Sequence, residues 1–365
     1  MFVNGISSLN AQAISSKEDA FFEEIQTYKT RNLNLYFSDF KQYIKPSAMR
    51  RMSSSIKMGV VAALQALENA KIQHPDAIIT GTGMGCKTDS DVFLEELLAS
   101  DEGLLSPTKF IQSTHNTVAG QIALQLQCKA YNMTYVQGSA SFESAMLDAF
   151  LQAASAKNKN FLVGGVDEIS KYTNDLHVLD GQLKEETEVQ NLQLLAYKTP
   201  GSIHGEGASF FVTSAQKSDS CYASVKDIQL YNQLKEDELE STIHSFLEKN
   251  NITPEEVDVV ILGNNGDVNF DKYYHLLQQG IFKETSQAYY KHLVGEFYTA
   301  SGFGFWLACK ILKLQELPSA CRLNDIQPQQ NQEPREIKPS GGIKKILLYN
   351  QYRGKDHSLI LLESC

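Results

Sequence analysis

Ser139 lies where a nucleophile is often found. The stretch TYVQGSASFESAMLDAF, residues 134–150, reads as the end of a strand, a tight turn and the start of a helix. Serine is a weak nucleophile at neutral pH unless a general base lies beside it. GSAS also lacks the GxSxG pattern of hydrolases. We therefore expect Ser139 mainly to fill space and to cap the helix.

A second polar group is the turn NNGD at residues 264–267. Asn264, Asn265 and Asp267 could bind a cation through their side-chain oxygens. A segment of this composition is far more often only a turn. We expect neither a metal nor a cofactor.

The cysteines are scattered along the chain and none has CxxC spacing, which argues against zinc. The first residues, MFVNGISSLNAQ, lack the charged and long apolar regions of a signal peptide. We therefore predict reduced thiols in the cytoplasm. The six residues are Cys86, Cys128, Cys221, Cys309, Cys321 and Cys365.

Composition narrows the class of protein. The formal charge of −10 argues against a nucleic-acid partner, which would need a basic surface. No apolar run reaches the roughly 18–20 residues of a membrane span. The 42% apolar and 21% charged residues are typical of a soluble globular chain.

Segments of two kinds alternate around these polar positions. Apolar runs that end in glycine predict buried strands at residues 77–85, 160–170 and 257–267. Helical spacing of apolar residues predicts helices over residues 53–72, 116–127, 141–156 and 300–315. Such alternation predicts an α/β fold with a covered sheet.

The pattern occurs twice. The polar segment SAQKSDSCYAS, residues 214–224, separates two predicted halves, residues 1–214 and 220–365. Residues 326–342 are rich in Gln, Pro and Gly and predict a surface loop.

Six segments, in this order, resemble the β-ketoacyl–acyl-carrier-protein synthases of the thiolase superfamily. They are MFVNGISSL, PSAMRRMSSSIKMGVVAALQALENAKI, IITGTGMG, HNTVAGQIAL, LVGGVDEIS and HGEGASFFV. The resemblance implies a thiolase-like five-layer α-β-α-β-α sandwich of two similar halves, usually dimeric. It also places residues 131–137 at the dimer interface, with Tyr135 among them.

The reaction of that family uses a cysteine at a helix N-terminus and two histidines. The cysteine becomes a thiolate that carries the acyl chain, and the histidines support decarboxylation and the enolate oxyanion. Here Ser139 falls at the cysteine position and Glu296 at the second histidine. The first histidine falls on Gly263 or Asn264, and neither side chain is a base.

Loss of all three groups resembles a chain-length-factor subunit, a ketosynthase-like protein without the active cysteine. The resemblance implies pairing with an active ketosynthase in type II fatty-acid or polyketide biosynthesis, with an aryl polyene or flexirubin-type pathway as our guess. A homodimer is the alternative. Arg50 and Arg51 could touch an acyl carrier protein.

Two enzymatic alternatives stay open. Ser139 could act as an acyltransferase or thioesterase nucleophile if a histidine lies beside it. The candidate bases are His115, His204, His292 and His357. Malonyl decarboxylation without condensation is the other, with Asn264 or Asn265 as hydrogen-bond donor.

Other residues have a functional and a structural interpretation. A buried Glu296 could be a general base, although an ion pair with Lys291 or Lys355 is favoured. Glu168 and Glu206 are expected in buried polar networks. Three phenylalanines could line a tunnel or belong to the core: Phe142, Phe303 and Phe305.

Overall fold

One ten-stranded sheet runs through the computed structural model, which describes residues 1–37, 39–101, 103–323 and 341–365. Its strand order is β12-β11-β13-β14-β10-β1-β9-β7-β5-β6. The strands of its first half are β1 (Phe2–Leu9), β5 (Ala77–Gly81), β6 (Tyr131–Tyr135), β7 (Asn160–Asp167) and β9 (Gly207–Ser214). Those of its second half are β10 (Ala223–Asn232), β11 (Val259–Leu262), β12 (Ser286–Tyr289), β13 (Lys345–Tyr352) and β14 (Asp356–Glu363).

The two halves of the sheet have the same topology. In the first, β1 is antiparallel to β9, β9 is antiparallel to β7, and β7, β5 and β6 are parallel. In the second, β10, β14, β13, β11 and β12 repeat these relations in the same order. The halves meet only at two residue pairs, Phe2↔Ser224 and Val3↔Ala223. The boundary between residues 214 and 220 remains a prediction.

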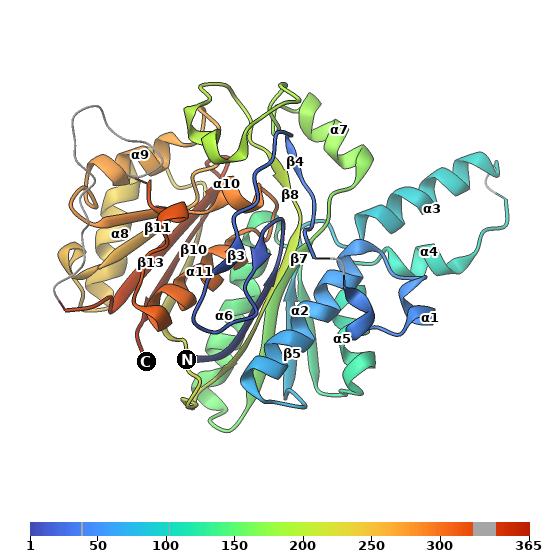
Figure 1. The fold of residues 1–365 in the computed structure, drawn as a ribbon, viewed down its shortest axis with the longest axis horizontal. Coiled ribbons are helices and arrows are strands. Elements are labelled where there is room, and N and C mark those ends of the chain that lie inside the picture. Colours follow the sequence, from blue (N-terminus) through green and yellow to red (C-terminus); the bar gives the residue numbers. More distant parts are fainter. Residues whose placement is uncertain (38, 102, 324–340) are drawn as a thin grey trace.

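Helices cover the sheet in layers (Figure 1). Helices α2 (Ser54–Ala70) and α5 (Thr117–Leu126) pack on one outer face. Helices α6 (Ser141–Ser155) and α11 (Ser301–Leu314) share the central apolar core. Helices α8 (Glu236–Lys249) and α9 (Lys272–Gln279) cover the other outer face. The expected five-layer sandwich is thus confirmed.

The shorter elements lie around these layers. Two small sheets pair β2 (Ala13–Ile14) with β3 (Phe22–Glu24), and β4 (Asn32–Leu33) with β8 (His204–Gly205). The remaining α-helices are α1 (Pro46–Met49), α3 (Lys87–Ala99), α4 (Pro107–Gln112), α7 (Lys171–Leu179) and α10 (Lys291–Val294). The 3-10 helices are η1 (Phe40–Gln42), η2 (Gly138–Ala140), η3 (Asn191–Ala196), η4 (Pro254–Glu256) and η5 (Ser319–Cys321).

The predicted strands and helices form where their apolar residues can be buried. Every residue of β5 and of β11 is buried, as expected of apolar strands covered on both faces. Helix α2 buries its run of Val and Ala residues against β1 and β9. The loop predicted at residues 326–342 lies almost wholly outside the described residues.

Helices α3 and α4 form an arm that projects from the layers (Figure 1). The rings of Phe93 and Phe110 pack at 5.4 Å between centroids and join the two helices. The arm also leaves apolar side chains exposed, among them Leu98, Leu104 and Ile111. A surface of this kind is typical of an interaction site.

Cys221 and Cys365 form a disulfide, so the prediction of six reduced thiols is wrong for these two. The pairing of Ser224 in β10 with Glu363 in β14 brings the two cysteines together. Their separation of 144 residues hides this proximity in the sequence. The thiol of Cys86 is buried, and burial raises its pKa to about 12.

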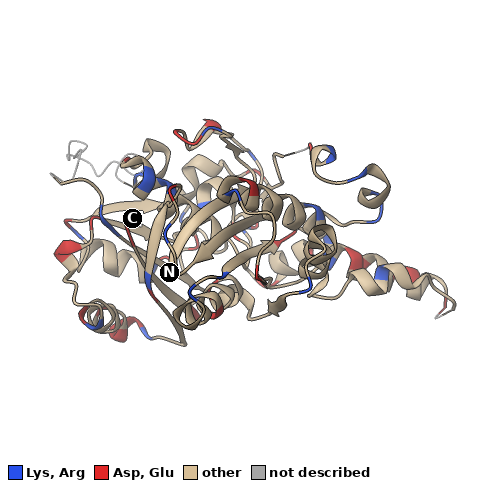
Figure 2. Ribbon diagram, turned by 90° about the horizontal axis from the view of Figure 1, so that it is seen from below, with Lys and Arg blue, Asp and Glu red and all other residues tan. Residues whose placement is uncertain are grey.

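Acidic and basic residues are interspersed over the molecule (Figure 2). Within the described ranges, no helix combines the length and apolar character needed to cross a membrane.

Candidate functional site

Ser139 sits in a sharply fixed turn between β6 and α6. Gly138 has a φ of +55°, which favours glycine. The Ser141 hydroxyl donates to the Gly138 carbonyl and accepts from the Gln137 amide. At Gly81 of β5, a Cβ would lie 2.3 Å from the Ser141 carbonyl oxygen, so only glycine allows this approach. Ser139 is 4% exposed, in η2 just before α6, as the sequence predicts.

The hydroxyl of Ser139 donates to a carboxylate and not to an imidazole. Its Oγ lies 2.7 Å from Oδ2 of Asp356, the first residue of β14. The carboxylate therefore lies close to the N-terminal end of α6, where the helix dipole favours an anion.

The candidate bases for Ser139 are engaged elsewhere. His292 bonds the Ala320 carbonyl through Nε2, and His357 bonds the Tyr349 hydroxyl through Nδ1. His204 Nδ1 lies 3.1 Å from the Asn174 carboxamide, and His115 is exposed. Within the described part of the chain, no hydrogen bond joins Ser139 to a histidine. The serine-enzyme alternative lacks its base.

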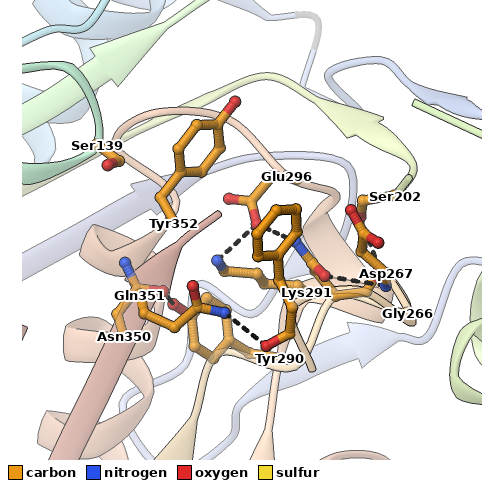
Figure 3. A network of polar contacts seen from close by, with 12 residues as sticks. Ser139, Ser202, Gly266, Asp267, Tyr290, Lys291, Glu296, Asn350, Gln351 and Tyr352 are labelled. Carbon is orange, nitrogen blue, oxygen red and sulfur yellow. Dashed lines mark hydrogen bonds and ion pairs between the residues drawn. The ribbon is translucent and has the colours of Figure 1, made fainter. Parts of the chain in front are cut away.

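Glu296 is paired, as the sequence favours. Its Oε2 accepts from Lys291 Nζ at 2.6 Å and from Asn265 Nδ2 at 2.7 Å (Figure 3). Lys291 is 1% exposed, so this is a buried ion pair. The carboxylate is thus tied down by two donors and is poorly placed to act as a free base.

The turn after β11 offers no base in place of the first histidine. A Cβ at Gly263 would lie 2.5 Å from Asn350 Oδ1, so glycine is required there. Asn264 accepts a hydrogen bond from Gln278, and its Nδ2 has no partner among the described residues. The Asp271 carboxylate accepts the amides of Asn265 and Gly266, and burial raises its pKa to about 7. This segment is built as a turn.

The cavity beside Glu296 is small. A cavity of about 30 Å³, lined by Asn265, Glu296 and Tyr352 among others, holds roughly one or two water molecules. The Tyr352 hydroxyl donates to Gln182, and its ring is 5.4 Å from that of Tyr298. Figure 3 draws this ring between Ser139 and the ion pair.

Two histidines, His177 and His204, line this cavity. His177 of α7 and His204 lie 5.4 Å apart between ring centroids. Burial lowers the pKa of both rings, that of His204 to about 3. The sequence flagged only His204, since α7 was not predicted. Neutral imidazoles here cannot supply a positive charge at neutral pH.

Glu168 and Glu206 belong to buried polar networks, as expected. The Glu168 carboxylate accepts the amides of Ser55 and Thr88, and burial raises its pKa to about 7. Glu206 accepts two backbone amides from separate segments. Asp167 accepts five hydrogen bonds, and burial raises its pKa to about 6.

The three flagged phenylalanines are core residues. Phe142, Phe303 and Phe305 are buried in the central cluster. Phe305 contacts both Phe142 and Phe211, with centroid distances of 5.8 and 4.7 Å. In the described ranges, no three His, Cys, Asp or Glu side chains lie together as metal ligands would.

Comparison with known proteins agrees with this fold. Residues 38–172 match the family model for the N-terminal domain of β-ketoacyl synthases. No curated protein sequence matches the chain significantly. The molecule therefore has the ketosynthase fold, and its resemblance to β-ketoacyl synthases is confirmed.

Solved structures cover all of this chain at low sequence identity. The ishigamide ketosynthase/chain length factor matches with a TM-score of 0.76, 16% identity and 98% of its own chain. The ketosynthase ApeO in complex with its chain length factor ApeC, from Xenorhabdus doucetiae, matches with 0.75, 12% and 98%. A β-ketoacyl synthase from Burkholderia phymatum STM815 matches with 0.74, 15% and 99%. At these identities the likeness establishes the fold.

Proposed function

We propose that this protein is a catalytically degenerate, chain-length-factor-like subunit that pairs with an active ketosynthase in type II fatty-acid or polyketide biosynthesis. The observation that carries the proposal is the carboxylate beside Ser139. A polyene pathway remains our guess for the product.

Condensation needs a thiolate nucleophile and donors for an enolate oxyanion. At the nucleophile position this chain has a hydroxyl bonded to Asp356, and at the second histidine position it has Glu296. Both carboxylates would repel a developing enolate. With about 30 Å³ of free space, the cavity beside Glu296 cannot accept an acyl chain in this conformation.

The edge of the sheet supports pairing with another subunit. Strand β6 is the last strand of its half, so one side of its backbone has no strand neighbour. Tyr131, Met133 and Val136 are exposed along it. A free edge with apolar side chains favours strand pairing with a second chain. Two of the similar structures are of a ketosynthase and a chain length factor.

A carrier protein is the second proposed partner. Arg50 and Arg51 are exposed beside α1. Neither has an ion-pair partner among the described residues. Unpaired guanidinium groups suit an acidic helix.

The test starts with the tagged protein isolated from its host and analysed by native mass spectrometry. We expect a one-to-one complex with a cysteine-bearing ketosynthase. Purified complex should condense acyl and malonyl carrier substrates, and Ser139→Ala should leave that rate unchanged because Ser139 is not the nucleophile.

Two matched variants test the interface. Met133→Asp on β6 should dissociate the complex, because a charge would be buried at the interface. Leu276→Asp on α9 should not, although Leu276 is also 40% exposed. A homodimer without a ketosynthase, or loss of activity in Ser139→Ala, would refute the proposal. Carbon dioxide release from malonyl carrier protein by the isolated chain would favour the decarboxylase instead.

A further inference from the structure

A separate cavity of about 570 Å³ lies along β1. Its walls come from residues 6–10 and 12–18, from Tyr36, Phe37, Asp39 and Tyr43, from α2 and from α11. This volume is in the range of ligand-binding pockets. None of Ser139, Asn264 or Glu296 lines it.

The cavity lies where β1 continues beyond the start of β10. The two strands pair only at Phe2 and Val3 of β1. Beyond Val3, the antiparallel register would set residues before Ala223 opposite β1, but β10 begins only at Ala223. From Gly5 to Leu9, β1 therefore has β9 on one side and no strand on the other.

The backbone groups that face this open side can be assigned. The Ile6 amide donates to the Asn69 side chain and so points away from β9. Ser8 and Ser209 lie directly opposite each other, and their hydroxyl oxygens are 2.9 Å apart. Side chains come this close in antiparallel pairs whose two residues share no backbone hydrogen bond. Because antiparallel partners alternate, the amide and carbonyl of Ser8 face the open side too.

Side chains replace the missing strand at two positions of β1, but not at Ser8. Asn69 satisfies the Ile6 amide, and the Ser220 hydroxyl donates to the Asn4 carbonyl. Ser8 is 3% exposed, and no described residue bonds its amide or carbonyl on that side. A buried backbone amide rarely lacks a partner, because leaving it unpaired costs about 1–3 kcal/mol. The Ser8 amide and carbonyl are thus available to pair with a strand from another chain.

The walls define what such a strand would carry. Aromatic rings border the cavity at Tyr36, Phe37, Tyr43, Tyr222 and Trp306. Four carboxylates and one exposed ammonium stand at its rim: Glu18, Glu23, Asp39, Glu68 and Lys17.

The other lysine of the wall, Lys310, offsets only part of this negative rim. The Lys310 ammonium is buried and donates to the carbonyls of Lys17 and Glu18. The rim therefore favours a cationic partner.

We propose that this groove binds an extended peptide segment bearing Lys or Arg, from a partner protein, that adds as a strand to β1 at Ser8. The backbone of the segment would pair with the Ser8 amide and carbonyl. Its basic side chains would meet the carboxylate rim, and its apolar ones the aromatic walls. This inference does not depend on the proposed function.

The experiment uses the full chain and two blocked heptapeptides, each with alternating valine and threonine, one flanked by lysines and one by glutamates. Amide hydrogen exchange and the nuclear magnetic resonance signal of the Ser8 amide are followed during titration. Without peptide, the Ser8 amide should exchange faster than that of Leu9. The lysine peptide should slow it by about tenfold or more, and the glutamate peptide should not.

Variants locate the effect. Glu18→Lys combined with Glu23→Lys should weaken lysine-peptide binding by about tenfold, while Glu248→Lys on α8, which is equally exposed, should not. A Ser8 amide already protected in the free chain would overturn the proposal. Equal binding of both peptides, or no shift of the Ser8 signal at millimolar lysine peptide, would overturn it as well.

Discussion

At the scale of single residues, carboxylates lie at or beside two positions where the resemblance predicts the reactive groups of a ketosynthase. Asp356 lies 2.7 Å from the hydroxyl of Ser139, and Glu296 lies 2.6 Å from Lys291. The positive end of α6 would favour a thiolate, but a neighbouring carboxylate opposes it.

Replacing Ser139 with cysteine should therefore give a thiol of low reactivity. We expect its pKa to lie above the ordinary value of about 8.5, because Asp356 disfavours a second negative charge beside it. Adding Asp356→Asn should lower that pKa by roughly one unit or more. Thiolate absorbance, measured against pH and corrected for the parent protein, gives both values. Asp219→Asn, at an exposed site, should change nothing, and an equal pKa in single and double variants would contradict this account.

The Lys291–Glu296 pair makes a second prediction at this scale. Lys291→Met leaves a buried carboxylate without its cation and should lower the free energy of unfolding by about 3–5 kcal/mol. Removing both charges with Lys291→Met and Glu296→Gln should cost less than the sum of the single changes. Urea unfolding measures all three.

The exposed pair Lys272–Glu236 has the same 2.6 Å separation and provides the control. Lys272→Met should cost less than about 1 kcal/mol. Additive losses at Lys291 and Glu296 would show that the buried pair is not coupled.

At the scale of elements, one side chain starts two helices. Glu168 accepts the Ser55 amide in the first turn of α2 and the Thr88 amide in the first turn of α3. The N-cap residues of both helices, Ser53 and Cys86, make no side-chain cap. A single carboxylate after β7 therefore fixes where the outer helix and the arm begin.

Burial raises the pKa of Glu168 to about 7, which links these helices to pH. Between about pH 4 and about pH 7 the folded chain holds a proton at Glu168 that the unfolded chain has released. This contribution to stability is therefore present at low pH and is lost as pH rises through about 7. Glu168→Gln should remove a decline in unfolding free energy on the order of 2 kcal/mol between about pH 5 and about pH 8.

Only the pH dependence, and not a constant offset, tests this idea. Urea unfolding at both pH values, with Glu248→Gln as the exposed control, supplies it. If the Glu168→Gln variant kept the same pH dependence as the parent, Glu168 would not titrate as described.

Sequence analysis identified the strands whose residues are all buried. Runs such as Ala77–Gly81 and Val259–Leu262 are buried on both sides, and their largely apolar sequence therefore predicts a strand. Strand β10 was missed because polar residues interrupt its apolar positions. The arm was missed because α3 buries few of its residues and so shows little helical periodicity.

The same limit applies to the candidate site. Lys291 and Glu296 are five residues apart, so their pairing followed from spacing and charge. Asp356 lies 217 residues from Ser139, and no local pattern connects them. His177 and Tyr352 reach the cavity only through the packing of the two halves.

At the scale of the whole molecule, the disulfide is the covalent link between distant parts of the chain. Cys365→Ser should lower the unfolding free energy by about 2–4 kcal/mol, because Cys221–Cys365 closes a loop of 144 residues in the unfolded chain. A reductant should lower the melting temperature of the parent and leave that of the variant unchanged. Cys128→Ser, which removes a free thiol, should keep the sensitivity to reductant. A parent protein indifferent to reductant would contradict the bond.

The contact between Ser139 and Asp356 also has an evolutionary consequence. Under the proposed function, a lineage that gained cysteine at position 139 in one step would obtain a thiol held neutral by Asp356, with Glu296 still paired to Lys291. Selection for condensation would find no advantage in that first step. Under that proposal, the change from enzyme to partner would be hard to reverse, because the residues that now bond Ser139 and Glu296 would also oppose condensation.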